Sequence, residues 1–240
     1  MKAILLAAGK AERLKGVLDC LPKPMVQIAG KPILEHNIEW LRSYGVTDVY
    51  INLHHLPEVI KRYFSNGIDR GVKITYSYEP ALLGTAGAVK KIAHDCWNDN
   101  PFEPFIVVYG DNLVSDFNLN RIIQFHKRKK GIATICLYHR PEEVSKSGVA
   151  VLDEDHRIIA FVEKPSAGQI AGDLVNTGIY ILEANILQYI PAGCCDFGKD
   201  VFGRVLDSGE SLYGIVLNAN LVAIDTPQLY ERVVDSGVLK

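Results

Sequence analysis

The feature that most constrains the fold is the alternation of short apolar, β-branched runs with stretches of helical periodicity. Such alternation predicts stacked βαβ units, because parallel strands need a crossover helix between them. The expected strands are Ala3–Ala7, Val49–Leu53, Lys73–Tyr78, Phe105–Tyr109 and Ile132–Tyr138. The expected helices are Pro32–Tyr44, Pro57–Phe64, Ala86–Asp95 and Asn118–Lys129, before a β-rich part with strands at Gly148–Asp153, Arg157–Val162 and Val175–Leu182. The pattern predicts an α/β fold with a mixed, mainly parallel sheet flanked by helices.

Composition and charge narrow the class of protein further. Of the 240 residues, 48% are hydrophobic, enough for one large core, and no linker-like segment interrupts the chain, so we expect a single domain over residues 1–240. A net charge of −2 offers no basic face for nucleic acid or for an anionic membrane. The N-terminal apolar run is too short for a membrane span and meets charges too early for a signal peptide, so we expect a cytoplasmic protein. Five cysteines without disulfide or zinc spacing are interpreted as reduced thiols.

The first expected strand leads into a long loop that contains Gly9 and continues to a lysine between two prolines, Lys23. Gly9 lets a ligand approach the backbone at the carboxyl end of a strand, where open α/β sheets bind their substrates. The loop matches neither G-x-x-x-x-G-K-[ST] nor G-x-G-x-x-G. Pro22 and Pro24 stiffen the backbone around Lys23, which suits a cation that meets a fixed anion. A phosphate site is the natural inference, and an ordinary solvated loop is the alternative.

Five motifs in order carry a resemblance to a known family. They are L-A-A-G-K-A-E-R-L at residues 6–14 with P-K-P-M at 22–25, E-P with L-G-T-A-G-A at 79–88, Y-G-D at 109–111, F-V-E-K-P at 161–165 and N-T-G-I-Y at 176–180. Together they resemble the sugar-1-phosphate nucleotidyltransferases, which include glucose-1-phosphate thymidylyltransferases and mannose-1-phosphate guanylyltransferases. The resemblance implies a Rossmann-like fold of the nucleotide-diphospho-sugar transferase type. It also implies an enzyme that joins a nucleoside triphosphate to a sugar 1-phosphate and releases pyrophosphate.

The resemblance assigns roles to particular residues of the nucleotide side. Arg13 would grip the leaving pyrophosphate, and Lys23 would contact the transferring α-phosphate. Asp111 ends a strand, where a carboxylate can hold Mg²⁺ together with phosphate oxygens, and it counts among the catalytic residues. The remaining nucleotide-binding candidates are Leu6, Ala8, Gly9, Lys10, Glu79, Gly84 and Thr85. The implied cofactor is therefore Mg²⁺.

The sugar side falls on four residues of the second half of the chain, namely Gly148, Glu163, Lys164 and Asn176. A carboxylate and an amide suit hydrogen bonds to ring hydroxyls, and the lysine suits the sugar phosphate. A surface ion pair of Glu163 with a neighbour is the alternative reading. The nucleotide-binding half is accordingly expected at about residues 1–130, and the sugar-binding half at about 131–240.

Two departures from the family pattern bear on the metal and on the first loop. Ala11 stands where many members have a second glycine, which adds a methyl group near the phosphates. Near the C-terminus, Ala223 stands at the position of the usual second metal carboxylate, and Asp225 lies two residues further on. Asp225 is the candidate for the second metal ligand.

The sequence leaves the substrates open. The segment Asp196–Phe202 resembles one in mannose- and heptose-type guanylyltransferases and favours GTP with a manno-configured sugar. The alternatives are a cytidylyltransferase for a small phosphorylated alcohol such as phosphocholine, and a regulatory paralogue that binds an NDP-sugar without turning it over. A homodimer or tetramer is compatible with an enzyme of this kind.

Overall fold

The computed structural model describes residues 1–9, 21–97, 103–114, 117–166, 168–169, 172–217 and, for the backbone, 221–223. The chain packs as two compact units, each assembled from segments far apart in sequence. Unit 1 comprises Met1–Leu82, Val108–Phe117 and Asn220–Lys240, and unit 2 comprises Leu83–Val107 and Asn118–Ala219. The strand β6 (Phe105–Tyr109) contributes residues to both units. The predicted division into a nucleotide half and a sugar half stays a prediction.

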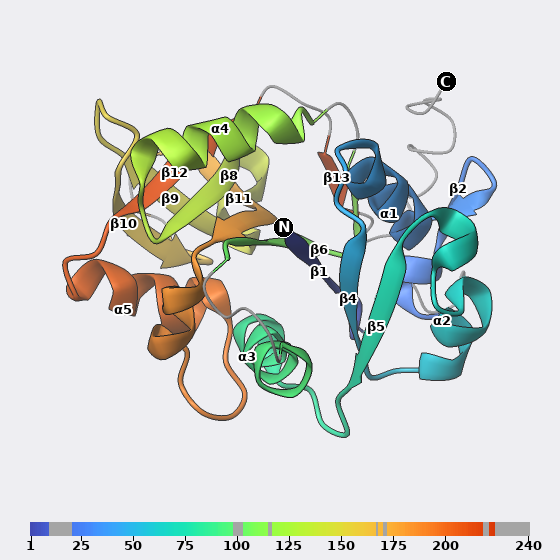
Figure 1. Ribbon diagram of the computed structural model, residues 1–240. Helices are drawn as coiled ribbons and strands as arrows, with labels where there is room; N and C mark the ends of the chain where they lie inside the picture. The colour runs from blue at the N-terminus through green and yellow to red at the C-terminus, as the bar shows by residue number, and fades with distance from the viewer. Residues whose placement is uncertain are drawn as a thin grey trace. The chain divides into compact units, whose positions relative to one another are not determined.

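Unit 1 is built on three parallel strands in the order β1–β4–β5 (Figure 1). Parallel strands buried on both faces are continuously apolar, and Ala3, Ile4 and Leu5 of β1 are fully buried. Helices α1 and α2 follow as crossover connections, and a short antiparallel pair, β7 with β13, lies beside α1. The elements are β1 (Lys2–Leu6), the 3₁₀ helix η2 (Lys23–Met25), β2 (Gln27–Ile28), β3 (Lys31–Pro32), α1 (Ile33–Ser43), β4 (Asp48–Leu53), α2 (Pro57–Phe64), the 3₁₀ helix η3 (Ile68–Arg70), β5 (Lys73–Tyr78), β7 (Asn112–Val114) and β13 (Leu221–Ala223).

Helix α1 shows how the sequence sets the limits of an element in unit 1. Pro32 immediately precedes the helix, and Gly45, with φ of 76°, follows its end in a left-handed conformation that favours glycine. Between these limits the buried residues are Ile33, Leu34, Asn37, Ile38 and Leu41, one face of a helix. The single polar member of that face, Asn37, is therefore the residue whose burial needs an explanation.

Unit 2 contains a mixed set of strands. Strand β11 pairs antiparallel with β8 and β9, β9 pairs antiparallel with β10, and β8 pairs parallel with β12. Helix α4 packs on β8, β11 and β12, as Figure 1 shows. The elements are α3 (Gly84–Cys96), α4 (Leu119–Lys129), β8 (Ala133–His139), η4 (Pro141–Lys146), β9 (Gly148–Leu152), β10 (Ile158–Glu163), β11 (Leu174–Leu182), η5 (Ala184–Tyr189), the π-helical turn η6 (Phe197–Val201), α5 (Phe202–Asp207) and β12 (Leu212–Val216).

An aromatic cluster anchors the π-helical turn of unit 2. The rings of Phe197 and Phe202 stack at 5.6 Å between centroids, and Tyr180 meets both rings edge-on at 5.4 and 5.3 Å. Phe161 of β10 contacts Phe202 at 5.1 Å. Such offset and edge-to-face contacts stabilise beyond the area they bury, so η6 is fixed firmly against β10 and β11.

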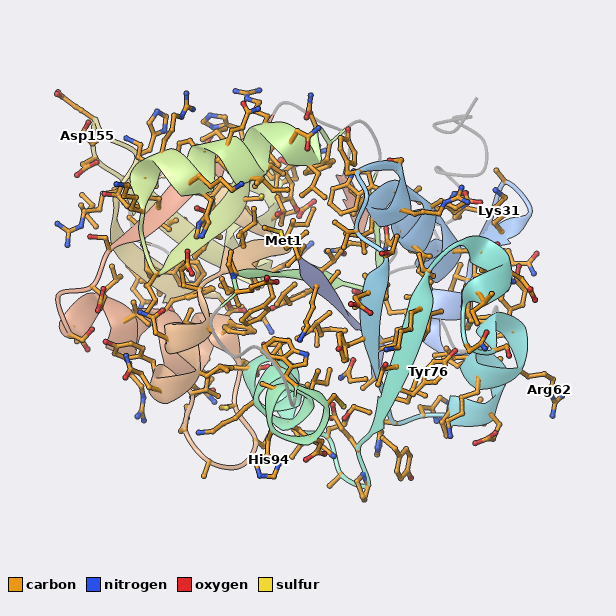
Figure 2. All side chains as sticks on the ribbon, in the orientation of Figure 1. Met1, Lys31, Arg62, Tyr76, His94 and Asp155 are labelled. Carbon is orange, nitrogen blue, oxygen red and sulfur yellow. The ribbon has the colours of Figure 1, made fainter. Side chains whose placement is uncertain are left out.

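The predicted elements agree with the observed ones to within two residues at their ends. Asn118 caps α4 by accepting a hydrogen bond from the Arg121 amide at 3.1 Å, and the charged side chains of Arg62 and Asp155 extend outward (Figure 2). Cys96, Cys136, Cys194 and Cys195 are free thiols, as expected. Among the described residues, none of the helices has the length and apolar character of a membrane span.

Candidate active site

The carboxyl end of β1 and the turn after β6 pack tightly in unit 1. The Gly110 amide donates a hydrogen bond to the Leu6 carbonyl at 2.9 Å. A Cβ atom at Gly110 would lie 2.9 Å from the same oxygen, a distance that real Cβ atoms essentially never show. Glycine at this position therefore brings the Y-G-D turn against the beginning of the predicted phosphate loop. Leu6, Ala8 and Gly9 all lie on this short stretch, with Ala8 buried and Gly9 exposed.

A buried polar relay holds the segment after β1. The Ala7 amide donates to Asn52 Oδ1 at 2.6 Å, and Asn52 Nδ2 donates to Glu79 Oε1 at 2.7 Å. Asn52 and Glu79 are 4% and 1% exposed, so each hydrogen bond replaces water that the groups have lost. The Glu79 carbonyl in turn meets His54 Nδ1 at 2.8 Å. Glu79 thus holds the segment after β1 indirectly, through its hydrogen bond with Asn52. Its contact with the nucleobase stays a prediction.

The structure brings together two of the predicted catalytic residues. Lys23 begins the 3₁₀ helix η2, and its Nζ forms an ion pair with Asp111 Oδ2. Pro22 has extended backbone angles of −60° and 143°, and Pro24 is buried in the helix, so the proline bracket fixes the lysine as expected. The side chains of Lys23 and Asp111 are 12% and 28% exposed. The cation is therefore largely desolvated beside a carboxylate that solvent or a ligand can still reach.

Helix α1 fixes the strand that follows Asp111. Asn37 Nδ2 donates to the Asn112 carbonyl at 2.8 Å, and Asn37 Oδ1 accepts from the Val114 amide at 3.2 Å. One turn later, Trp40 Nε1 donates to the Phe117 carbonyl at 2.8 Å. These hydrogen bonds explain why Asn37 lies on the buried face of α1. Its amide group binds a carbonyl and an amide of β7 that would otherwise need a neighbouring strand as partner.

The other edge of β7 pairs with β13, whose register places Ala223 opposite Asn112, the neighbour of Asp111. The second predicted metal ligand, Asp225, lies outside the described residues, as do Lys10 and Arg13. Within the described ranges, no three His, Cys, Asp or Glu side chains gather closely enough to hold a metal by themselves. Mg²⁺ needs only one or two carboxylates when substrate phosphates and water complete its shell, so the accessible carboxylate of Asp111 fits that ion.

In unit 2, the start of α3 is bound by a segment more than a hundred residues away. The Thr85 amide and hydroxyl both donate to Asp196 Oδ1, at 2.8 and 3.1 Å, and the Ala86 and Gly87 amides donate to the Cys195 carbonyl at 3.0 and 3.2 Å. Gly84 has a φ of 72°, and a Cβ there would collide with the Cys195 carbonyl group. The amides that open α3 thus hold residues 195–196, and nucleotide binding by Gly84 and Thr85 stays a prediction.

Glu163 lies between two glycines of unit 2. It is paired with Gly148 across β9 and β10, and a Cβ on Gly148 would stand 2.8 Å from Glu163 Oε2. A Cβ on Gly198 of the π-helical turn would collide with the same oxygen. Burial raises the pKa of Glu163, the Lys164 ammonium opposes that rise, and the nearby Asp196 carboxylate adds to it. The absence of two side chains therefore makes room for the partly buried carboxylate of Glu163 itself.

Asn176 and Lys164 complete the predicted sugar side. Asn176 Nδ2 donates to the Tyr180 hydroxyl at 2.7 Å, and its Oδ1 accepts from the Gly178 amide at 2.9 Å across an irregularity in β11. Lys164 has a φ of 50°, and its amide donates to the Ser147 carbonyl at 3.0 Å. Its exposed ammonium is thus directed by a backbone conformation that few lysines adopt.

Three residues that position the site are not among the site residues that the sequence predicts. Asn52 and Asn37 each interrupt an apolar face, and a lone polar residue in a buried face is the signal that would have found them. Asp196 lies in a segment that the sequence relates only to substrate preference. Its contact with Thr85 links the predicted nucleotide-binding and sugar-binding residues of unit 2, because the same π-helical turn carries Gly198 against Glu163.

A parallel β1–β4–β5 core with loops after the carboxyl ends of its strands defines an open α/β class of protein, and such sheets bind their ligands at that edge. The family model described as "Nucleotidyl transferase" matches residues 2–222, and the chain belongs to that family. The expected fold class is confirmed by solved structures. One is HddC from Yersinia pseudotuberculosis complexed with GMP-PN, which has a TM-score of 0.79 and 25% identity and covers 98% of this chain and 98% of its own.

Curated relatives carry names of sugar-1-phosphate nucleotidyltransferases. The chain is 39% identical to a UTP–glucose-1-phosphate uridylyltransferase of Synechocystis sp. over 93% of its own length and 60% of the relative. It is 36% identical to the mannose-1-phosphate guanylyltransferase catalytic subunit beta of Dictyostelium discoideum, over 95% of its own length and 62% of the relative. The chain thus spans about three fifths of the length of the curated relatives it matches.

Proposed function

We propose that this chain transfers a nucleotidyl group from a nucleoside triphosphate to a sugar 1-phosphate, forming an NDP-sugar and pyrophosphate. The observation that carries the proposal is the contact of Lys23 with Asp111 in unit 1. A fixed cation beside an accessible carboxylate, directly after the strand β6, suits a bound phosphate chain and its metal. Membership of the nucleotidyl transferase family supports the same reaction.

The reaction is an in-line displacement at the α-phosphorus. An oxygen of the sugar phosphate attacks, the bond from the α-phosphorus to the bridging oxygen breaks, and pyrophosphate leaves. The nucleophile is already an anion at neutral pH, so no general base is needed, and positioning with charge neutralisation supplies most of the rate. Lys23 meets the charge that grows on the α-phosphate, and Arg13 holds the pyrophosphate.

Asp111 and Asp225 would hold Mg²⁺, which supplies further neutralisation to the phosphate oxygens when it is bound. Asn37 acts through the backbone, since its amide holds the strand that follows Asp111. On the sugar side, the carboxylate of Glu163 accepts hydrogen bonds from the sugar hydroxyls, and Lys164 meets the sugar phosphate.

For the substrates we propose GTP and a manno-configured sugar 1-phosphate. The segment Asp196–Phe202, which favours this pair, touches both Thr85 and Glu163. Several relatives are named mannose-1-phosphate guanylyltransferases. A uridylyltransferase is among the relatives as well, so UTP with glucose 1-phosphate is the pair to compare.

The test is a pyrophosphate-release assay with Mg²⁺ over ATP, GTP, CTP, UTP and dTTP against several hexose 1-phosphates. Lys23→Gln and Asp111→Asn are compared with Lys31→Gln, which removes an exposed cation paired with Glu39 in the same unit. We expect turnover with one substrate pair, a loss of about 10²-fold or more in both site variants, and native activity in Lys31→Gln.

Asp225→Asn decides the second metal ligand, because its loss of turnover should be relieved in part by higher Mg²⁺ if it binds the ion. Circular dichroism confirms that each variant is folded. Turnover that survives in both Lys23→Gln and Asp111→Asn would contradict the proposed site, and binding of NDP-sugar without any turnover would favour the regulatory paralogue.

A further inference from the structure

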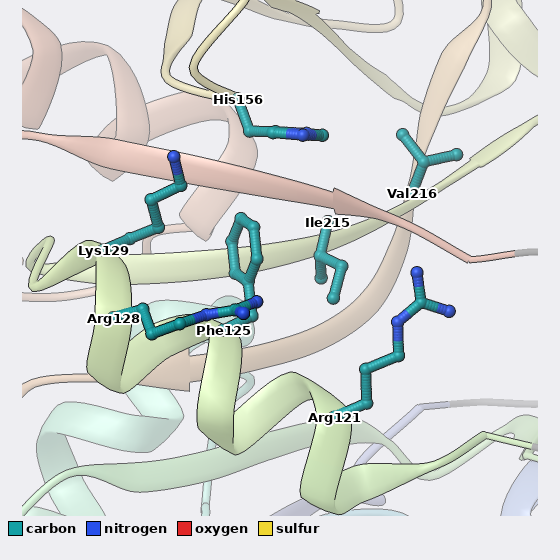
Figure 3. A pocket seen from close by; sticks show the side chains of 7 residues that line it. All are labelled: Arg121, Phe125, Arg128, Lys129, His156, Ile215 and Val216. Carbon is teal, nitrogen blue, oxygen red and sulfur yellow. The ribbon is translucent and has the colours of Figure 1, made fainter.

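A cavity of about 480 Å³ in unit 2 is lined by none of the described residues assigned above. One side is a single face of α4, and the other is formed by the end of β12 and the turn between β9 and β10 (Figure 3). Its lining residues are Arg121, Phe125, Arg128, Lys129, His156, Ile215 and Val216. The four from α4 follow the spacing i, i+4, i+7 and i+8, which brings them onto one face of the helix.

The charge of this cavity is of one sign. Arg121, Arg128 and Lys129 carry positive charge, and none of the described residues that line the cavity is a carboxylate. None of the three forms an ion pair with another residue of the described chain. The nearby carboxylate of Asp153 accepts hydrogen bonds from two amides of its own turn, at 2.9 and 2.8 Å. The cavity therefore offers positive charge that this part of the protein does not neutralise.

The helix dipole does not account for all of these cations. Lys129 and Arg128 lie in the last turn of α4, where positive charge is favourable. Arg121 lies in the first turn, where the dipole opposes a cation, and that turn holds no acidic residue. An anion that binds between the two ends would explain why all three cations share one face.

A neighbouring cavity on the same helix has a different character. It is lined by Lys127 and Lys130 together with Glu183 and Glu210, so charges of both signs meet there. The excess of positive charge is thus a property of the face that carries Arg121 and not of the C-terminal end of α4 as a whole.

The rest of the described lining consists of two rings, Phe125 and His156, and of the aliphatic side chains Ile215 and Val216. Figure 3 shows Arg121 and Lys129 on opposite sides of Phe125 and Ile215, with His156 facing them from the opposite turn. The His156 ring meets Phe125 edge-on at 5.7 Å, and its backbone, with a φ of 63°, is held by a hydrogen bond from Gly214 to its carbonyl at 2.9 Å. A volume of this size accommodates a small organic ligand.

We infer that this cavity binds a small organic phosphate, whose phosphate group meets Arg121 and Arg128 and whose apolar part packs on Phe125 and Ile215. Planar guanidinium groups match phosphate oxygens in two-point hydrogen bonds, and the apolar floor adds burial of a ring or hydrocarbon portion. The inference does not depend on the proposed transferase activity, since none of the described residues of that site lines the cavity.

The test is calorimetric titration of the whole chain with phenyl phosphate at low ionic strength, beside inorganic phosphate and phenol. The double variant Arg121→Gln/Arg128→Gln is matched by Lys127→Gln/Lys130→Gln, which removes the same charge from the same helix. We expect saturable binding of phenyl phosphate, weakened at least about tenfold in the arginine variant, within about twofold of native in the lysine variant, and weaker for phosphate and phenol.

Lys23→Gln separates this site from the proposed active site, because it should leave the binding of phenyl phosphate unchanged. Arg121, Arg128 and Lys127 are exposed on α4 and Lys130 is exposed directly after its end, and thermal melting confirms that the variants fold. An equal loss of phenyl phosphate affinity in the two double variants would mean that only the overall positive charge of the helix matters, which would overturn the inference. Absence of saturable binding, or binding of inorganic phosphate as tight as that of phenyl phosphate, would overturn it as well.

Discussion

Removal of the Asn52 side chain is the perturbation whose cost follows most directly from the structure. Asn52→Ala deletes the acceptor of the Ala7 amide and the donor to Glu79, both in surroundings that are almost fully buried. A buried amide left without a partner costs about 1–3 kcal/mol, and a lost hydrogen bond to a charged group about 1.5–3 kcal/mol. Together these predict a loss of about 3–5 kcal/mol in the free energy of unfolding.

Urea denaturation followed by circular dichroism measures this loss. Asn120→Ala is the control, because Asn120 is exposed on α4 and its replacement should change stability by less than about 0.5 kcal/mol. The double variant Asn52→Ala/Glu79→Ala should cost less than the sum of the single changes, since each single change removes the one hydrogen bond that the two residues share. A loss below about 1 kcal/mol in Asn52→Ala, or strict additivity with Glu79→Ala, would refute the relay.

Three further predictions concern unit 2. Burial raises the pKa of Glu163 above its ordinary 4.5. As the pH rises, the unfolded chain loses that proton before the folded protein does, so the free energy of unfolding falls. Denaturation at several pH values should therefore show that Glu163→Gln becomes more stable than the unmutated protein from about pH 4 upward. Burial lowers the pKa of His126 below 6.5, so the stability of the protein falls on acidification. Thermal melts of His126→Gln should therefore depend less on pH below about 6.5, and an unchanged pH dependence would contradict this assignment. Asp196→Ala removes the acceptor of the Thr85 amide and hydroxyl and should lower the free energy of unfolding by about 1 kcal/mol, and Asp196→Asn should lower it less. Equal stability of the unmutated protein and the two variants in urea denaturation would argue that Asp196 does not cap α3.

Much of the secondary structure could be predicted because its signals are local. The apolar run of β1 and the Pro32 and Gly45 boundaries of α1 depend only on neighbours in sequence. The short pair β7 and β13 has no such signal, since its strands of three residues are stabilised by each other and by Asn37. Pairing between distant segments is a tertiary property, and a period of two cannot be recognised in three residues.

The candidate site divides in the same way. Lys23 and Asp111 are separated by 88 positions, and only the family resemblance joined them before the fold brought their side chains into contact. The sequence predicts that Glu79 contacts the nucleobase. The burial of Glu79 against Asn52 depends instead on the pairing of β1, β4 and β5, which is a tertiary property. Lys10, Arg13 and Asp225 stay predictions of the sequence alone.

The sequence by itself determined the alternation of strands and helices, the family and the residue types that chemistry at a phosphate requires, because these are recorded in local periodicity and in motifs. Only the tertiary structure decided that Asp196 would cap α3, that Gly148 and Gly198 would flank Glu163, and that Arg121 would share a cavity with Arg128 and Lys129. The physical reason is that hydrogen bonds and burial act through space. The partner that satisfies a buried group is chosen by packing, whatever its separation along the chain.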